Sequence, residues 1–238
     1  MRLHINHIAL LLLVSWSVQA QEQVQETKYA IKLDSTIHTK WAPTGVRIGL
    51  DIAGPIYHLF EPSISNYEGT ADIDFGKFFG VVEVGRGSFQ QKNTPTQYTS
   101  SGFFYRVGAD VNMTSKDAKL NVLYFGLRYA TASFNETLLG ELESDGWGTS
   151  LINETQSKSR ANWVELNLGM RARIYKSIFM GYTVRFKLLK HNAFNDGKFE
   201  TYFVPGYGIA TNTSNWGISY YVQYRIEWKK KPIPWKEN

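Results

Sequence analysis

Few side chains of this sequence are suited to acid–base or nucleophilic chemistry. A catalytic triad needs a nucleophile, a base and a group that orients the base. The chain has His38 in a polar stretch, and it can assemble such a set only from His58 or His191 with Ser88 or Ser133 and Glu136. These residue types are common and no motif fixes their geometry. The sequence therefore favours a protein without catalytic activity, in which the histidines are solvated loop residues.

Metal and phosphate chemistry have still weaker signals. The chain has no cysteine, and neither His-x-x-x-His nor His-Glu-x-x-His occurs. Asp72 and Asp74 could contact a cation together, but nearby arginines explain them better as ion-pair partners. Gly206-Tyr207-Gly208 follows Pro205 and predicts a turn rather than a phosphate-binding loop. We expect no metal and no cofactor.

The strongest chemical pattern is a set of charges that recur at every second residue. In residues 161–175, Glu165, Arg171 and Arg173 alternate with apolar residues, which places them on one face of a strand. The equivalent faces of other segments carry the cations Arg47, Arg106, Arg128, Arg185, Lys187 and Arg225. They also carry the anions Asp51, Asp72, Asp74, Glu83, Asp110 and Glu227. Because a buried charge is costly unless it is paired, near-equal numbers predict an interlocked ionic network.

The elements that must position these charges are eight alternating segments. They are predicted at 45–53, 67–75, 78–90, 102–113, 121–134, 161–175, 178–190 and 215–228. Each is long enough to cross a bilayer as a tilted strand, which takes roughly 9–11 residues. Abundant Tyr, Phe, Trp and Gly and few helix signals indicate an all-β protein.

The connections between the segments alternate in length. Those at 76–77, 114–120 and 176–177 are short, whereas those at 54–66, 91–101, 135–160 and 191–214 are long. Successive connections of an up-and-down barrel lie at opposite ends, so one end has tight turns and the other has long loops. This asymmetry is typical of outer-membrane barrels. The loop at 135–160 is rich in apolar residues and is expected to pack on itself as a cap, or to bind a partner.

Glycines indicate which face points inward. Several glycines lie on the same strand faces as the charged residues, which together form a charged wall. They are Gly49, Gly85, Gly108, Gly126, Gly169, Gly181 and Gly217. A glycine on a solvated wall only weakens a strand, whereas inside a narrow barrel it makes room for a long neighbour. At eight strands the interior is just wide enough for side chains to fill it, so we expect no open pore.

Aromatic residues are expected to form two girdles around the apolar band. Those near the long-loop end are Phe89, Phe103, Phe134, Trp163 and Trp216. Those near the short-turn end are Phe78, Tyr124, Tyr175, Phe179, Tyr224 and Trp228.

The start of the chain predicts export. Arg2, an apolar run and small residues ending at Ala20 form a signal peptide over residues 1–20, cleaved near Ala20. Residues 21–44 are expected to be a periplasmic lead-in, 45–228 the barrel and 229–238 a basic tail. After cleavage, 25 of the 26 Lys and Arg remain against 21 Asp and Glu, too small a surplus to indicate nucleic acid.

Several stretches resemble a known group of proteins. The final strand, Ser219-Tyr220-Tyr221-Val222-Gln223-Tyr224-Arg225-Ile226-Glu227-Trp228, is similar to those of small OmpA-like barrels. Gly45-Val46-Arg47-Ile48-Gly49-Leu50-Asp51, Phe125-Gly126-Leu127-Arg128-Tyr129 and Val204-Pro205-Gly206-Tyr207-Gly208 resemble an uncharacterised family of outer-membrane β-barrels from Bacteroidetes-type bacteria. The resemblance implies a fold and a location but no activity. Such barrels end on an aromatic residue that the assembly machinery reads, whereas here residues 229–238 follow Trp228.

The sequence thus predicts a single eight-stranded antiparallel up-and-down transmembrane β-barrel with a plugged, charged interior. The expected role is non-enzymatic, structural in the cell envelope or exerted through surface loops. Expected partners are outer-membrane lipid and the barrel assembly machinery, with an unknown surface ligand and no nucleic acid. The alternatives are a lipid-modifying barrel enzyme, a narrow channel (a porin-like role), or a soluble lipocalin-like binder with its apolar wall inside.

Overall fold

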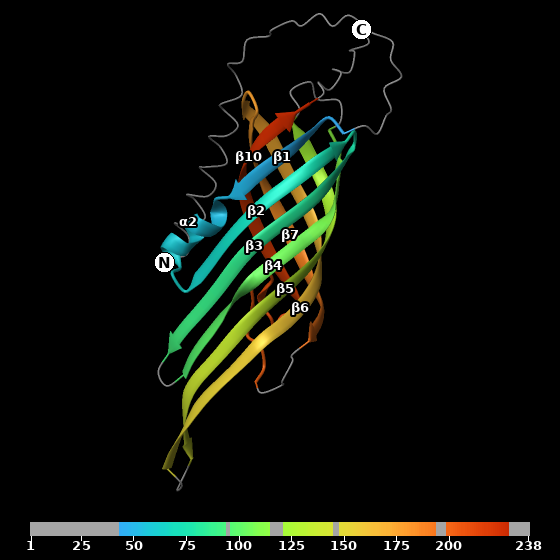
Figure 1. The fold of residues 1–238 in the computed structure, drawn as a ribbon. Helices are drawn as coiled ribbons and strands as arrows, with labels where there is room; N and C mark the ends of the chain where they lie inside the picture. Colours follow the sequence, from blue (N-terminus) through green and yellow to red (C-terminus); the bar gives the residue numbers. More distant parts are fainter. Residues whose placement is uncertain (1–42, 94–95, 115–120, 145–147, 194–198, 229–238) are drawn as a thin grey trace, which may run out of the picture. The chain divides into compact units, whose positions relative to one another are not determined.

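Eight strands of the computed structural model close into one antiparallel ring (Figure 1). The structure describes residues 43–93, 96–114, 121–144, 148–193 and 199–228. The segments predicted as a signal peptide and a basic tail, and most of the predicted lead-in, lie outside these described residues. The barrel strands are β1 (Gly45–Asp51), β2 (Ile64–Phe75), β3 (Phe78–Asn93), β4 (Thr96–Asn112), β5 (Val122–Ser144), β6 (Gly148–Tyr175), β7 (Ile178–Ala193) and β10 (Ser214–Glu227).

Each barrel strand pairs with its neighbour in sequence, and β1 pairs with β10 to close the ring. The order around the barrel is β1-β10-β7-β6-β5-β4-β3-β2. The prediction of an all-β chain with eight antiparallel strands is therefore confirmed. The closing register pairs Arg47 with Arg225 and Gly49 with Gln223, so inward residues meet inward residues across the seam.

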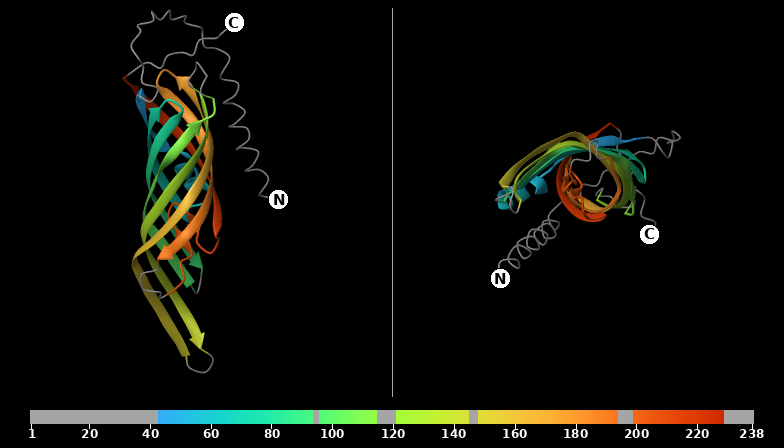
Figure 2. Two further views of the ribbon diagram at one scale, coloured as in Figure 1. Left: turned by 90° about the vertical axis from the view of Figure 1, so that its right-hand side faces the viewer. Right: turned by 90° about the horizontal axis from the view of Figure 1, so that it is seen from below.

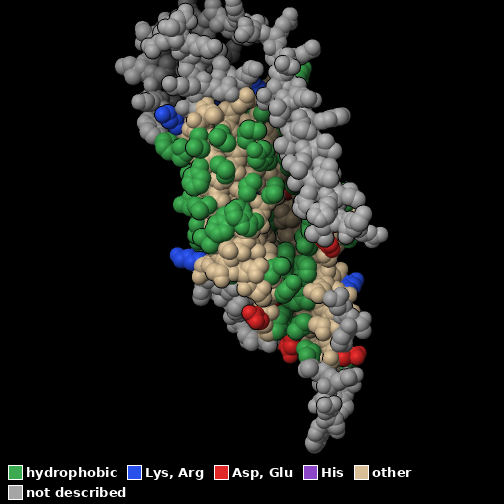
Figure 3. Space-filling model, turned by 180° about the vertical axis from the view of Figure 1, so that it is seen from behind, with side chains coloured by type: hydrophobic (Ala, Val, Ile, Leu, Met, Phe, Trp, Pro, Cys, Tyr) green, Lys and Arg blue, Asp and Glu red, His purple; other side chains and the backbone are tan. Residues whose placement is uncertain are grey.

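Alternation along each strand separates two walls. On β6, Glu165 and Asn167 are fully buried, whereas Leu166 and Leu168, which alternate with them, are exposed. The polar wall therefore faces the lumen and the apolar wall faces outward. Hydrophobic side chains cover much of the outer surface in the space-filling view, and charged side chains lie at the margins of that region (Figure 3).

The two ends of the barrel differ. At one end, the tight turn at Gly76–Lys77 joins β2 to β3, and Lys176–Ser177 joins β6 to β7. At the other end, β5 and β6 continue beyond the other strands as a projecting hairpin (Figure 2). We call residues 135–157 the hairpin arm.

The predicted long loop at 135–160 is therefore wrong. β5 and β6 stay paired as far as Ser144 and Gly148, with one bulge near Phe134 and Glu136. Cross-strand pairs such as Thr137 with Thr155 suit a pleated strand surface, which explains the continued pairing. The loop predicted at 91–101 is wrong for the same reason, because β3 and β4 pair as far as Asn93 and Thr96.

Two other connections carry structure of their own. Residues Ala53–Phe60 form the short helix α2 between β1 and β2. The connection after β7 contains the small pair β8 (Phe203–Val204) and β9 (Gly208–Ile209). Among the described residues, no helix is long and apolar enough to cross a membrane.

The predicted aromatic girdles need correction. Phe134, Trp163, Tyr124 and Phe179 are buried inside the barrel. Each lies an even number of residues from an inward residue on its strand and therefore faces the same side, as Trp163 does two positions before Glu165. Outward aromatics do remain at both ends, among them Phe103 and Trp216 at one end and Phe78 and Tyr224 at the other.

Candidate functional site

The centre of the lumen is organised around Arg106 on β4. Its Nε donates to Glu165 Oε1 at 2.9 Å, and its Nη1 donates to Glu68 Oε2 at 2.6 Å. Nη1 also lies 3.3 Å from Glu83 Oε2, and the guanidinium stacks on the Phe104 ring at 4.4 Å from the ring centroid. One arginine thus joins carboxylates from three other strands, β2, β3 and β6.

A second arginine, Arg185 on β7, binds the same carboxylates from the opposite side. Its Nη1 donates to Glu83 Oε2 and its Nη2 to Glu68 Oε1, both at 2.9 Å. The Tyr221 hydroxyl donates to Glu68 and accepts a hydrogen bond from Arg185. Because Arg106 and Arg185 share their partners, the central charges form one connected network rather than separate pairs.

Toward the short-turn end, Asp72 joins two arginines. Arg47 contacts Asp72 Oδ1 at 2.5 Å through Nη2, and Arg171 contacts Asp72 Oδ2 at 2.6 Å. Both guanidinium groups lie over the Phe79 ring, at 4.6 Å and 5.1 Å from its centroid. Arg171 also lies 3.6 Å from Asp110, which continues the network to β4.

Arg128 connects the two parts of the network. It lies 3.2 Å from Glu83 Oε1 and 3.1 Å from Asp110 Oδ2. At the short-turn rim, Arg225 pairs with Asp74 at 3.1 Å. The lumen is therefore crosslinked from its centre to this rim.

Three residues expected in the network lie outside it or at its edge. Asp51 is buried, but it accepts hydrogen bonds from the backbone N–H groups of Gly54 and Tyr220. Arg173 is exposed at the short-turn end. Glu227 keeps 37% of its side chain exposed and lies 3.5 Å from Arg225. All the other residues expected in the network are buried in the lumen.

Glu68 is a central member that the sequence analysis missed. It occupies the same alternate positions of β2 as Asp72 and Asp74, and it lies inside the segment predicted at 67–75. Following the alternation back from Asp72 through Thr70 would have found it. Tyr221 occupies the same alternate positions of β10 as Arg225, but its residue type gave no sign of a charged partner.

Glycines make the space that the network occupies. A Cβ on Gly126 would collide with the Asp110 carboxylate, and one on Gly108 would lie 2.8 Å from Arg128 Cγ. A Cβ on Gly181 would lie 2.7 Å from Arg171 Cβ. These inward glycines therefore lie beside charged side chains that need their space.

The loop-side end of the lumen is closed by residues 203–210, which contain β8 and β9. We call this segment the plug. Val204 and Tyr207 are buried, and the Tyr207 ring packs edge-on against Trp163 at 5.7 Å. Around the plug, the barrel wall contributes small or aromatic side chains. The apolar cluster that results comprises Phe104, Ala130, Ala132, Phe134, Ala161, Trp163, Val204, Tyr207 and Ala210.

The network and the plug are directly joined. The Gly206 carbonyl accepts hydrogen bonds from Arg106 Nη2 at 3.0 Å and from Lys187 Nζ at 2.8 Å. Gly206 has φ +79°, and a Cβ there would lie 2.5 Å from Phe104 Cγ. The turn predicted at Gly206–Gly208 therefore exists, but it is buried in the barrel rather than exposed in a loop.

Glu136 lies on β5 above the plug, past the part of the strand whose outward side chains are apolar. Its side chain is buried. Thr201 Oγ1 donates to its Oε1 at 2.8 Å, and burial raises the pKa of the carboxyl above its usual range. The Tyr98 hydroxyl on β4 accepts a hydrogen bond from the Phe203 N–H at 3.2 Å, and burial raises the pKa of Tyr98 too. These side chains hold the outer edge of the plug segment.

No described contact brings the candidate catalytic residues together as a triad. His58 Nδ1 bonds the Ile64 carbonyl at 2.7 Å, and Ser88 shares a hydrogen bond with Ser65. Ser133 is exposed on the outer wall, and the side chain of His191 lies outside the description. Within the described residues, no group of three His, Cys, Asp or Glu is arranged to hold a metal ion.

Fold and interior together define a closed eight-stranded antiparallel barrel filled by an ionic network and a folded-back plug. The chain belongs to the family described as a domain of unknown function (DUF6048), whose sequence model matches residues 1–231. No curated protein and no solved structure matches the chain.

Proposed function

We propose that this protein is a sealed outer-membrane β-barrel with a non-enzymatic role in the cell envelope. The observation that carries the proposal is the distribution of side chains, with ionic groups inside and apolar groups outside. Leu50, Val107 and Ile218 are 67%, 56% and 61% exposed, although they lie within regular strands. Soluble monomers rarely expose continuous apolar surface of this kind, whereas lipid covers it at no cost.

The same distribution argues against a soluble lipocalin-like binder. Such a barrel would place its apolar wall inside, around a ligand cavity. Here Glu83, Arg185 and Glu165 fill the middle of the lumen and are each at most 2% exposed. The interior offers charge-paired side chains rather than an apolar site.

The lumen also argues against a constitutive channel. Arg106 and Arg185 cross it to partners on other strands, and the plug closes its loop-side end. A sealed barrel leaves its outward parts as the functional surfaces, namely the hairpin arm and the outer wall. We propose that envelope contacts are made there, and that lipid and the barrel assembly machinery are its partners.

Membrane fractionation tests the location. We expect the protein in the outer membrane and a gel mobility that shifts only after boiling. Recovery as a soluble protein without detergent would overturn the proposal. Planar-bilayer recordings then separate the sealed barrel from a narrow channel, since a channel gives defined conductance steps and a sealed barrel gives none.

A further inference from the structure

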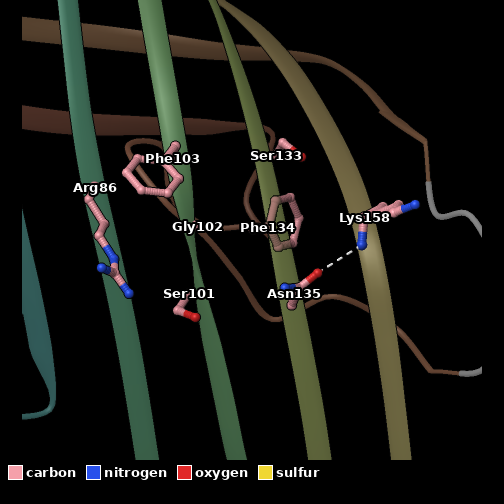
Figure 4. Close-up of a pocket in the computed structure, with 8 residues that line it drawn as sticks. All are labelled: Arg86, Ser101, Gly102, Phe103, Ser133, Phe134, Asn135 and Lys158. Atoms are coloured by element: carbon pink, nitrogen blue, oxygen red, sulfur yellow. Dashed lines mark hydrogen bonds between the residues drawn. The ribbon is translucent and has the colours of Figure 1, made fainter.

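A pocket of about 310 Å³ lies on the outer wall of the barrel, across β3, β4, β5 and β6 (Figure 4). Its lining residues are Arg86, Ser101, Gly102, Phe103, Ser133, Phe134, Asn135 and Lys158. Arg86 and Lys158 lie on opposite sides, with hydroxyl and amide groups between them, and the Lys158 side chain extends away from Arg86 (Figure 4). The pocket lies outside the lumen and takes no part in its network.

The pocket occupies the border of the apolar outer wall. On β3 the outward residues are Val82 and Val84, and the next outward residue is Arg86. On β4 the outward run ends at Phe103, and Ser101 follows. Polar residues thus replace apolar ones at the same edge of neighbouring strands.

The strand register brings a second cation to this border. Arg86 pairs with Phe103, Phe103 with Ser133, and Ser133 with Arg160, which lies two residues from the lining cation Lys158. The Arg86 guanidinium lies over the Phe103 ring at 5.5 Å. None of the eight lining residues is acidic, so the site has the charge and donors that suit phosphate.

Lys158 is held in an unusual backbone conformation. Its φ is +60°, in the region that glycine favours, and it lies at the bulge where residues 157 and 158 of β6 oppose the single residue Asn135 of β5. Asn135 Oδ1 accepts from the Lys158 N–H at 2.9 Å and supports this conformation (Figure 4). A long cation therefore stands where glycine would fit best, and strain of this kind often marks a functional position.

We propose that this pocket binds the phosphorylated sugar headgroup of a glycolipid in the outer leaflet. The inference rests on the proposed membrane location. The backbones of β3 and β6 are three strand spacings apart, roughly 14 Å, which suits a headgroup larger than a single phosphate. Arg86 and Lys158 bind phosphate, Ser101, Ser133 and Asn135 bind sugar hydroxyls, and the adjoining apolar wall receives the acyl chains.

Native mass spectrometry of the full-length mature protein from detergent micelles tests the site. The probe is a bisphosphorylated diglucosamine lipid, compared with the same lipid without phosphates. We expect the wild type to retain the phosphorylated lipid selectively, and the double variant Arg86→Gln/Lys158→Gln to bind it at least tenfold more weakly. A charge-matched control, Lys92→Gln/Lys190→Gln, removes two exposed cations outside the pocket and should bind as the wild type does.

The single variant Lys158→Gly separates binding from folding. Glycine relieves the backbone conformation, so this variant should fold at least as well as the wild type and still lose several-fold in affinity. Equal binding by wild type and pocket variants, or equal binding of both lipids, would overturn the site. Displacement of the lipid by inorganic phosphate at the same concentration as the lipid would show a simple anion site and would also overturn the glycolipid assignment.

Failure of this inference is distinguishable from failure of the proposed function. If the protein is soluble without detergent and shows no heat-dependent mobility shift, the membrane location itself fails. If the shift is present but lipid selectivity is absent, the membrane barrel stands and only the pocket assignment falls.

Discussion

Two layers of the lumen are filled in different ways. In the middle layer, long charged side chains such as Arg106, Arg185 and Glu83 cross the barrel and meet each other. In the loop-side layer, the wall carries small residues such as Ala130 and Ala132, and the plug fills the space. The size of the wall side chains therefore decides whether a backbone segment can enter the lumen.

The comparison also concerns energetics. Charges in the middle layer depend on one another, because each lost partner leaves another charge buried and unpaired. The plug layer depends on packing, and a lost side chain there leaves a cavity. Damage to the middle layer should therefore spread through the network, whereas damage to the plug layer should stay local and open the barrel mouth.

The largest expected effect comes from removing the central arginine. Arg106→Ala removes one of the two arginines that Glu68, Glu83 and Glu165 share and should destabilise the fold by about 3–5 kcal/mol. The measurement is urea unfolding in detergent micelles, followed by the heat-dependent gel shift.

Arg173→Ala is the matched control for this experiment, since Arg173 is an exposed arginine on β6. Its free energy of unfolding should change by about 0.5 kcal/mol or less. A similar loss for both variants would show that the network contributes nothing beyond ordinary surface charge.

A somewhat smaller effect is expected in the plug layer. Tyr207→Ala removes a buried ring that packs against Trp163 and should cost about 3 kcal/mol. We also expect brief conductance steps in planar bilayers, because the plug is loosened. A silent bilayer with an unchanged unfolding midpoint would contradict a sealing role for the plug.

A change outside both layers should stabilise the protein. Lys158→Gly places glycine at the positive φ of the β6 bulge and should raise the free energy of unfolding by about 1 kcal/mol. Urea titration beside the wild type measures it. The opposite sign would show that the Lys158 side chain makes contacts that outweigh its backbone conformation.

The smallest effect is a pH dependence at the outer edge of the plug. Burial raises the pKa of Glu136 from 4.5, so the folded state favours the protonated form. The contribution of Glu136 to the free energy of unfolding is largest at acidic pH. It falls as the pH rises from the pKa of Glu136 in the unfolded state toward its pKa in the folded state. Glu136→Gln keeps an acceptor for Thr201 and should flatten this part of the profile, as thermal unfolding across pH 4 to 8 would show.

The sequence alone determined the strand pattern and the two walls. Alternation in residues 161–175 put Glu165 and Arg171 on one face, and the glycines of that face indicated that it points inward. Both are local properties, since side-chain parity and the space left by a missing Cβ can be read from adjacent positions. The same parity would have placed Trp163 and Phe134 inside and Glu68 in the network.

Only the tertiary structure decided how the two layers are filled and where the outer pocket lies. Residues 203–210 enter the lumen because small wall residues on β3, β5 and β6 leave room, a match between segments far apart in sequence. Arg86 and Lys158 become neighbours across one pocket only after β3, β4, β5 and β6 pair in register. Such pairings depend on non-local hydrogen bonds and volumes, which no single stretch of the chain contains.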